Sequence, residues 1–219
     1  MIRFENLTKS YQVRGTKKIV INNLNTELPT GKSLALLGLN GAGKSTLMQL
    51  IAGTLRADSG RVVSDGSISW PVGFGGSFHP ELTGAQNVRF IARIYGVDTD
   101  ELIAFVEDFA ELGKHFNMPV RSYSAGMRSR LTFGASFGIQ FDTYLVDEVT
   151  AVGDAAFRRK SHALFKDRMK TSSAILVTHE MGQVRSFCDS GILLHAGDLT
   201  YFEDIDEAIQ AHLDVVNDR

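Results

Sequence analysis

The glycine-rich segment Gly38–Ser45, which reads GLNGAGKS, limits the possible folds of this chain more than any other part of it. It matches the phosphate-loop pattern G-x-x-x-x-G-K-[ST] in full. An apolar strand (Ser33–Leu37) is predicted directly before the segment, and an amphipathic helix (about Lys44–Ala52) directly after it. The segment therefore predicts an α/β fold of the P-loop NTPase type.

The phosphate loop also predicts which residues hold a nucleotide. Glycines let the backbone curl so that successive N–H groups point at phosphate oxygens, and the helix N-terminus adds positive potential there. Lys44 can reach the β- and γ-phosphates of ATP, and the Ser45 hydroxyl can ligate Mg²⁺. The expected nucleotide contacts in this part of the chain are Gly38, Leu39, Asn40, Gly41, Ala42, Gly43, Lys44, Ser45 and Thr46.

Two acidic residues and a histidine follow predicted strands further along the chain. Asp147 and Glu148 come directly after the apolar strand Tyr144–Val146, which we expect to run beside the strand that precedes the phosphate loop. Asp147 would then hold Mg²⁺, directly or through water, and Glu148 would orient and polarise the attacking water. His179 follows the predicted strand Ala174–Val177, where a neutral imidazole can hydrogen-bond the γ-phosphate. In isolation, acidic strand ends and strand-end histidines are also common surface features.

The order of the predicted elements indicates a single domain, residues 1–219, with a helical subdomain of about residues 83–138 inserted in it. Short strands are predicted near the N-terminus, at Phe4–Leu7 and Ile19–Leu28. Between Thr83 and about Gly138 the apolar residues recur at helical spacing instead. These stripes are Val88, Ile91, Ala92 and Tyr95, and Leu102, Phe105, Val106 and Phe109.

Composition excludes several classes of protein. The chain has 219 residues and a net charge of −2. A slightly acidic protein is not expected to bind nucleic acid, which is itself an anion. No run approaches the roughly 18 apolar residues that span a bilayer, and the charged N-terminal segment is not a signal peptide. We therefore expect any action at a membrane to require another subunit. The one cysteine, Cys188, is expected to be a buried thiol.

These motifs, in this order, resemble the ATP-binding-cassette (ABC) family over nearly the whole chain. Ser124–Met127 falls where the family signature is expected, Ala151–Asp154 resembles the D-loop, and His179 resembles the switch histidine. Tyr11 resembles the aromatic residue that stacks on adenine, although a tyrosine at a strand end is the alternative. The resemblance implies a RecA-like core of the ABC ATPase type, with an N-terminal antiparallel β subdomain and an inserted α-helical subdomain.

The resemblance also implies a homodimer in which each copy completes the site of the other. Ser124, Gly126 and the N-terminus of the following helix would form a second anion site, which in this family meets the γ-phosphate bound to the partner subunit. Ser124 would there stabilise charge on the transferred phosphoryl group. The expected catalytic residues are Glu148, His179, Lys44 and Ser124. The expected cofactors are ATP, whose adenine contacts Tyr11, and Mg²⁺, whose ligands are Ser45 and Asp147.

Departures from the family pattern narrow the resemblance to one branch. Tyr123, Ala125 and Met127 replace the usual leucine, glycine and glutamine, and residues 70–76 contain no glutamine where the Q-loop belongs. The pattern resembles the polysaccharide-exporting branch, and the length most resembles capsule-export ATPases of Gram-negative bacteria. This implies two transmembrane permease subunits as partners at the cytoplasmic face of the inner membrane, with capsular polysaccharide as indirect cargo. An O-antigen or teichoic acid exporter, or a soluble ABC ATPase outside transport, is the alternative.

Overall fold

The computed structural model describes residues 1–29, 31–72, 78–147, 154–178 and 180–218. The chain divides into two compact units, and each is described by itself. The first unit takes in Met1–Pro71, Phe141–Glu148 and Thr171–Arg219. The second takes in Val72–Gln140 and Val149–Lys170.

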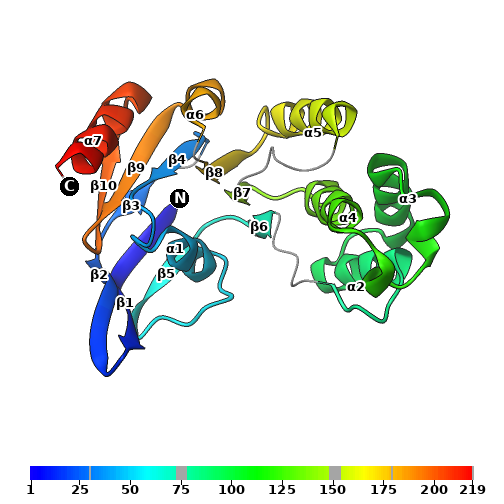
Figure 1. The fold of residues 1–219 in the computed structure, drawn as a ribbon, viewed down its shortest axis with the longest axis horizontal. Helices are drawn as coiled ribbons and strands as arrows, with labels where there is room; N and C mark the ends of the chain where they lie inside the picture. Colours follow the sequence, from blue (N-terminus) through cyan, green and yellow to red (C-terminus); the bar gives the residue numbers. More distant parts are fainter. Residues whose placement is uncertain (30, 73–77, 148–153, 179, 219) are drawn as a thin grey trace. The chain divides into compact units, whose positions relative to one another are not determined.

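The first unit is built from two β-sheets and their covering helices (Figure 1). Its strands are β1 (Ile2–Val13), β2 (Thr16–Leu24), β3 (Glu27–Leu28), β4 (Leu34–Leu37), β5 (Ser59–Ser64), β6 (Ile68–Val72), β7 (Thr143–Asp147), β8 (Ser173–Val177), β9 (Ser190–His195) and β10 (Asp198–Phe202). Its helices are α1 (Lys44–Ile51), α6 (Met181–Phe187) and α7 (Ile205–Asn217). One sheet has the order β2-β1-β3, with β5 also paired to β1, and the other has the order β10-β9-β4-β8-β7-β6.

The order of the larger sheet corrects one prediction. The strand that ends at Asp147 does not run beside the strand that precedes the phosphate loop, because β8 lies between them. Strand β8 is parallel to both neighbours, with Ile175 opposite Leu34 of β4 and Val177 opposite Asp147 of β7. The prediction was wrong because it placed strands by their motifs, and a strand later in the sequence separates the two. The ends of β4, β7 and β8 nevertheless meet at one edge of the sheet.

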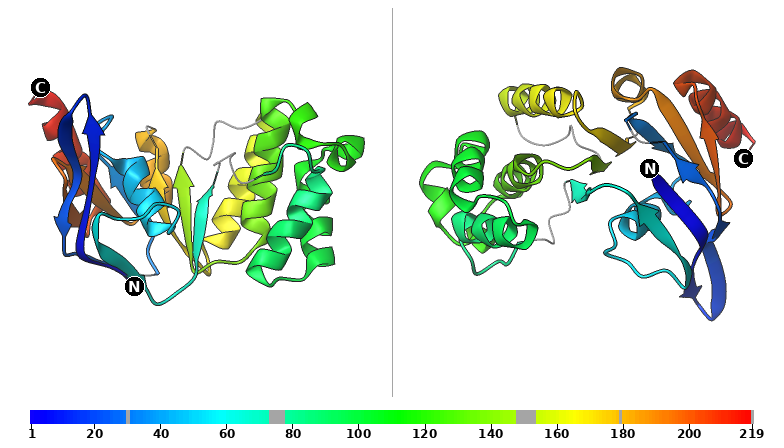
Figure 2. Two further views of the ribbon diagram at one scale, coloured as in Figure 1. Left: turned by 90° about the horizontal axis from the view of Figure 1, so that it is seen from below. Right: turned by 180° about the vertical axis from the view of Figure 1, so that it is seen from behind.

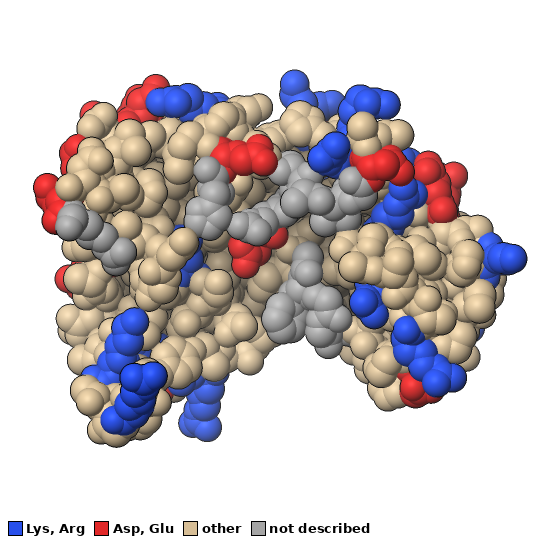
Figure 3. Space-filling view, viewed as in Figure 1, with Lys and Arg blue, Asp and Glu red and all other residues tan. Residues whose placement is uncertain are grey.

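The N-terminal strands form a hairpin that is longer than the apolar pattern suggested. Strands β1 and β2 pair as far as Val13 and Thr16, and Tyr11 lies opposite Lys18 within the ladder. Arg14 and Gly15 make the turn at φ values of 50° and 81°, as expected for a two-residue hairpin connection. The outer part of the hairpin is exposed and polar, which hid it from a search for apolar runs. Lys and Arg side chains gather over its end (Figure 3).

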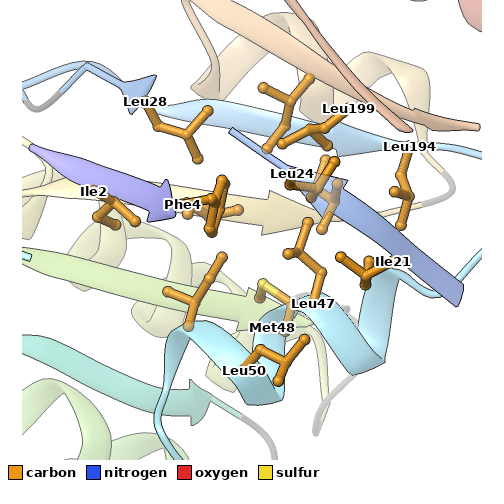
Figure 4. Packing of buried hydrophobic residues seen from close by; sticks show 14 of the residues in the cluster. Ile2, Phe4, Ile21, Leu24, Leu28, Leu47, Met48, Leu50, Leu194 and Leu199 are labelled. Carbon is orange, nitrogen blue, oxygen red and sulfur yellow. The ribbon is translucent and has the colours of Figure 1, made fainter. Parts of the chain in front are cut away.

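The core of the first unit lies between α1 and the strands. Leu47 and Met48 of α1 are fully buried and point towards Phe4 of β1 and Leu24 of β2 (Figure 4). Helix α7 covers the opposite face of the larger sheet. A Cβ atom at Gly191 of β9 would lie only 2.4 Å from the Cβ of Ala208 in α7. The phosphate loop thus leads from a strand buried on both faces into a helix that is itself anchored in the core.

The second unit is helical and holds α2 (Gly84–Tyr95), α3 (Thr99–Ala110), the 3₁₀ turns η2 (Gly113–Asn117) and η3 (Val120–Ser122), α4 (Ala125–Gly138) and α5 (Ala155–Arg168). Helices α2, α3 and α4 lie side by side in both views of Figure 2. Helix α2 begins with a capping box, in which Thr83 and Gln86 each accept a hydrogen bond from the backbone N–H of the other. Gln86, the glutamine that follows the Q-loop position, is therefore bound locally.

Aromatic rings hold α3, α4 and α5 together. The ring of Phe133 in α4 stacks on Phe109 and Phe137, with centroids 5.7 and 4.5 Å away, and Phe157 of α5 meets Phe109 edge-on at 5.3 Å. Gly138 allows α3 and α4 to approach closely, because a Cβ there would lie 2.4 Å from a methyl carbon of Leu102. Across the described residues, none of the helices combines the length and the apolar character that crossing a membrane requires.

Candidate nucleotide-binding site

The phosphate loop has a backbone that only glycine can adopt at two points. Gly38 has a φ of 148°, and a Cβ there would lie 2.5 Å from the carbonyl oxygen of Leu194. Gly43 has a φ of 112°, and a Cβ there would lie 2.3 Å from a methyl carbon of Val20. Any side chain at either position would displace the loop from β9 or β2. These two contacts fix where the loop lies against the core.

Lys44 turns back over the loop that precedes it. Its Nζ donates hydrogen bonds to the carbonyl oxygens of Gly38 and Leu39, at 2.6 and 3.1 Å. Burial lowers the pKa of the Lys44 ammonium group, and the negative charge of Asp147 partly opposes that shift. The Lys44 ammonium and the Asp147 carboxylate therefore interact, although the strand that leads into the loop (β4) and the strand that ends at Asp147 (β7) are not adjacent.

A pocket of about 460 Å³ opens above the loop, within the size range of small-ligand sites. It is lined by Val20, Asn40, Gly41, Gly43, Lys44, Ser45, Thr46, Asp147 and Val177. Helix α1 begins in this pocket at Gly43, and no side chain caps its first turn among the described residues. The first N–H groups of the helix are thus left for an anionic ligand, with the positive charge of Lys44 in the same pocket, and the phosphates of a nucleotide fit this arrangement.

Oxygen ligands for a divalent cation lie in the same pocket. The Ser45 hydroxyl is at the start of α1, and the Asp147 carboxyl group is at the end of β7. Mg²⁺ binds such oxygen atoms together with water and phosphate oxygens. The donor set therefore fits Mg²⁺, which Ser45 and Asp147 would hold.

Tyr11 reaches the phosphate-loop helix from β1. Its hydroxyl group lies within hydrogen-bond distance of the Thr46 hydroxyl, at 3.4 Å, and the residue is 39% exposed. Thr46 lines the phosphate pocket, so the ring stands beside the site and has surface free for a ligand. The structure thus brings Tyr11 together with the predicted phosphate contacts.

The signature segment forms a second pocket, which lies within the helical unit. Ser124 is the N-cap of α4, where its hydroxyl group accepts a hydrogen bond from the N–H of Met127 at 3.2 Å. The pocket has a volume of about 360 Å³ and is lined by Glu111, Leu112, His115, Ser124, Gly126, Met127, Arg130 and Asp154. Ser124 and Gly126 are exposed. The start of α4 is therefore accessible to a ligand or to another chain.

Tyr123, which departs from the family pattern, is part of the core. It is 4% exposed, and its hydroxyl group donates a hydrogen bond to the carbonyl oxygen of His115 at 2.6 Å. Gly84 leaves room for it, because a Cβ there would lie 2.5 Å from the Tyr123 oxygen. The tyrosine thus fills the usual leucine position and fixes the segment that leads into Ser124.

Four other predicted features lie outside the described residues. Glu148 and His179 are among them, and so are residues 151–153 of the D-loop and residues 73–76 of the Q-loop region. Their roles stay predictions. Asp154, the last residue of the D-loop, is described and is the N-cap of α5.

Arg130 acts through partners that are distant in the sequence, and no motif reveals it. Arg130 forms ion pairs with Asp154 at 2.7 Å and with Glu111 at 3.7 Å, and its guanidinium group lies over the ring of Phe157. The only local signal was the N-cap pattern at Asp154. Nothing in the sequence around Arg130 indicates that one side chain links α3, α4 and α5.

Fold and pocket together define a P-loop nucleotide-binding protein. A family model described as ABC transporter matches residues 21–151. The chain belongs to the ABC transporter family and is one of its ATPase subunits. ATPases of this family bind ATP and ADP.

Comparisons with individual proteins agree with this placement. The chain is 49% identical to the polysialic acid transport ATP-binding protein KpsT of Escherichia coli, over 97% of this chain and 96% of the relative. It is 42% identical to the capsule polysaccharide export ATP-binding protein CtrD of Neisseria meningitidis, over 96% and 97%. Exporters of O-antigen and teichoic acid are more distant relatives. The dimeric post-hydrolysis structure of the cassette MJ0796, bound to ADP and phosphate, shares the fold at a TM-score of 0.77 and 21% identity, covering 92% of this chain and 98% of that one.

Proposed function

We propose that this chain binds and hydrolyses MgATP to power the export of capsular polysaccharide through a membrane permease. The observation that carries the proposal is the identity of 42–49%, over almost the full length of both chains, to KpsT and CtrD. Export of O-antigen or teichoic acid is less well supported, because those exporters are more distant relatives. No observation favours a soluble ABC ATPase outside transport.

The proposed hydrolytic site includes Lys44, Ser45 and Asp147, which the structure describes, and Glu148 and His179, which it does not. Lys44 and the loop N–H groups bind the phosphates, and Ser45 and Asp147 hold Mg²⁺, which neutralises phosphate charge. Glu148, the next residue after Asp147, orients and polarises the attacking water, and His179 hydrogen-bonds the γ-phosphate. Support for the roles of Lys44, Ser45 and Asp147 comes from the pocket that they share.

The second anion site acts in a homodimer, where Ser124 and Gly126 meet the γ-phosphate bound to the other copy. Gly126 supports this role, because packing against the described residues does not require a glycine there. Among those residues, a Cβ at this position would approach only the Ser124 oxygen, at 3.9 Å. A close-fitting phosphate or partner backbone would account for a glycine at this exposed position.

Two copies of the ATPase work with two transmembrane permease subunits at the cytoplasmic face of the inner membrane. The permease carries the polymer, so capsular polysaccharide is an indirect cargo of this chain. Fractionation tests the attachment: the ATPase should sediment with membranes when its permease is co-expressed and should stay in the supernatant otherwise. Equal sedimentation in both cases would contradict attachment through the permease.

The cargo is tested in cells that lack the native copy of this chain. We expect the wild-type chain to restore surface capsular polysaccharide and Lys44→Ala to fail at equal expression. O-antigen and teichoic acid are measured in the same cells. Loss of one of those polymers instead of capsule would move the assignment to the corresponding exporter.

The composite site is tested with mixed protomers. Ser124→Arg protomers and Lys44→Ala protomers should each be inactive alone, whereas their heterodimer should contain one site built from two intact halves. The expected result is partial recovery of ATP hydrolysis on mixing. Glu148→Gln provides the control for dimer formation, because it should bind ATP, hydrolyse it very slowly and accumulate as a closed dimer. Isolated heterodimers without any activity would contradict the arrangement.

A further inference from the structure

Asp58 ties the loop after α1 to β1, beside the candidate adenine contact. One of its carboxylate oxygens accepts hydrogen bonds from the N–H and the hydroxyl group of Ser10, at 2.7 and 2.6 Å. The other accepts one from Lys9 Nζ at 2.9 Å. The Asp58 N–H donates to the carbonyl oxygen of Thr8, also at 2.9 Å. A single residue thus holds three consecutive residues of β1 immediately before Tyr11.

The carboxylate of Asp58 stays charged over the whole physiological range. The hydrogen bonds from Ser10 and Lys9 lower the pKa of Asp58 to about 2. Strand β1 is irregular here, with register shifts between Leu7 and Lys9 and between Lys9 and Ser10. Pairing with β2 therefore does not by itself fix the backbone of β1 just before Tyr11, and the hydrogen bonds of Asp58 add to it.

Lys9 lies over the aromatic ring of Tyr11. Its Nζ is 5.6 Å from the ring centre and also donates a hydrogen bond to the carbonyl oxygen of Arg56, at 2.9 Å. The Lys9 side chain is only 14% exposed, which is low for a lysine at the surface. Two acceptors fix the ammonium group over one face of the ring. Tyr11 is 39% exposed, so the ring also has surface that a ligand can reach.

The far end of the ring is fixed to the phosphate pocket. The Tyr11 hydroxyl group meets the hydroxyl of Thr46, which lines that pocket. Asp58 therefore fixes the three residues that precede Tyr11, Lys9 lies over its ring, and Thr46 meets its hydroxyl group.

We propose that Asp58 and Lys9 are positioning residues for the adenine base, which hold Tyr11 so that its exposed ring surface stacks on the base of ATP. The inference rests on the proposed role of Tyr11 in binding adenine. Neither residue touches the nucleotide. Both act through Tyr11, which contacts only the planar base. Replacing either residue should therefore weaken binding of ATP and leave binding of an inorganic triphosphate unchanged.

The experiment compares affinities of the full-length chain for MgATP and for magnesium tripolyphosphate. The variants are Tyr11→Ala, Asp58→Ala, Asp58→Asn and Lys9→Met. Stacking contacts of this kind predict that Tyr11→Ala weakens MgATP binding about tenfold, and the positioning variants about three- to tenfold. Tripolyphosphate binding should stay at the wild-type value in all of them, and the KM for ATP should rise while kcat changes little.

Matched controls separate positioning from general damage to the fold. Asp142 accepts hydrogen bonds from the N–H and the hydroxyl group of Ser67, both at 2.7 Å, which copies the Asp58–Ser10 pattern elsewhere in the same unit. Lys32 forms an exposed ion pair with Glu203. We expect Asp142→Ala and Lys32→Met to leave both affinities unchanged. Asp58→Asn and Lys9→Met keep the side-chain volume, so the test stands if Asp58→Ala does not fold.

Three results decide the matter. Selective loss of ATP affinity, with no further loss when Asp58→Ala is added to Tyr11→Ala, supports the inference. Equal loss of ATP and tripolyphosphate affinity, or no loss in folded Asp58 and Lys9 variants while Tyr11→Ala is defective, overturns it and leaves the adenine contact intact. No effect of Tyr11→Ala overturns both the adenine contact and this inference.

Discussion

Arg130 and Asp154 form an ion pair of 2.7 Å that joins the signature helix α4 to the first turn of α5. Asp154 closes the D-loop segment and also accepts hydrogen bonds from the N–H groups of Ala156 and Phe157. Arg130 is only 19% exposed and lies in the same pocket as Ser124. One charged pair thus links the segment that resembles the ABC signature to the end of the segment that resembles the D-loop.

Replacing Asp154 should separate its two roles. Asp154→Ala removes both the cap of α5 and the partner of Arg130, so we expect a lower urea midpoint than for the wild type. Asp154→Asn keeps an acceptor for the N–H groups and loses only the charge, so its midpoint should lie between the two. Equal midpoints for Asp154→Ala and Asp154→Asn would mean that the cap contributes nothing measurable.

Lys44→Ala should lower the affinity for MgATP by about two orders of magnitude, because a charged donor is removed from a partly buried anion site. Isothermal calorimetry on the full-length chain measures the change. The hydrogen bonds to Gly38 and Leu39 are also lost, so the melting temperature is recorded in parallel. Unchanged ATP affinity in a folded variant would refute the assignment of the phosphate loop.

Two glycines of α4 should respond in opposite ways to the same substitution. Gly126→Ala makes no tight contact with the described residues and should leave the free energy of unfolding unchanged or raise it by up to about 1 kcal/mol, because alanine favours helix. Gly138→Ala would press on Leu102 and Phe105 and should lower it by about 1–2 kcal/mol. Urea denaturation measures both. Gly126→Ala should still impair ATP-driven dimerisation in gel filtration, and intact dimerisation would argue against a trans phosphate contact.

Asp58 should make a pH-dependent contribution to stability. Its pKa is about 2 in the folded protein against a usual value of 3.8, so the folded state binds the proton less readily than the unfolded state. The stabilisation is therefore complete above about pH 5 and is lost as the pH falls towards about 2. The melting temperature of the wild type should exceed that of Asp58→Asn by a constant amount at neutral pH, and the gap should narrow in acid. A gap that widens in acid would contradict the assignment.

Cys188 should be inert in the folded protein. The residue is 5% exposed, and burial raises the pKa of its thiol to about 12, so very little thiolate forms at about pH 8. A thiol reagent such as Ellman's reagent should react slowly with the native chain and rapidly in denaturant. Fast reaction under native conditions would show that the helix before Cys188 opens readily.

The sequence alone predicts the parts of the site whose residues are consecutive in the chain. The phosphate loop, the strand before it and the helix after it follow from one run of residues, because the loop must be rich in glycine and must start a helix. Helices within the stretch from Thr83 to Gly138 were also predictable, since buried positions recur at helical spacing. The buried state of Cys188 followed from its apolar neighbours.

The sequence was insufficient where partners are distant in the chain. Lys9 and Asp58 are 49 residues apart, and the sequence around each residue does not indicate that the two interact. The position of β8 between β4 and β7 depends on which strands pair, which strand hydrophobicity does not encode. Tyr11 lies in the outer part of the hairpin, where neither strand buries a side chain, so no alternation of apolar residues predicts the strand there.

The central position of β8 also bears on how the protein is made. Because β8 is the strand that joins β4 to β7, the phosphate loop and Asp147 become part of one hydrogen-bonded sheet only after residue 177 has left the ribosome. A shorter nascent chain carries both halves of the ATP pocket without the strand that connects them. We therefore expect ATP to stabilise the emerging chain only late in translation, after the earlier segments have emerged without that stabilisation.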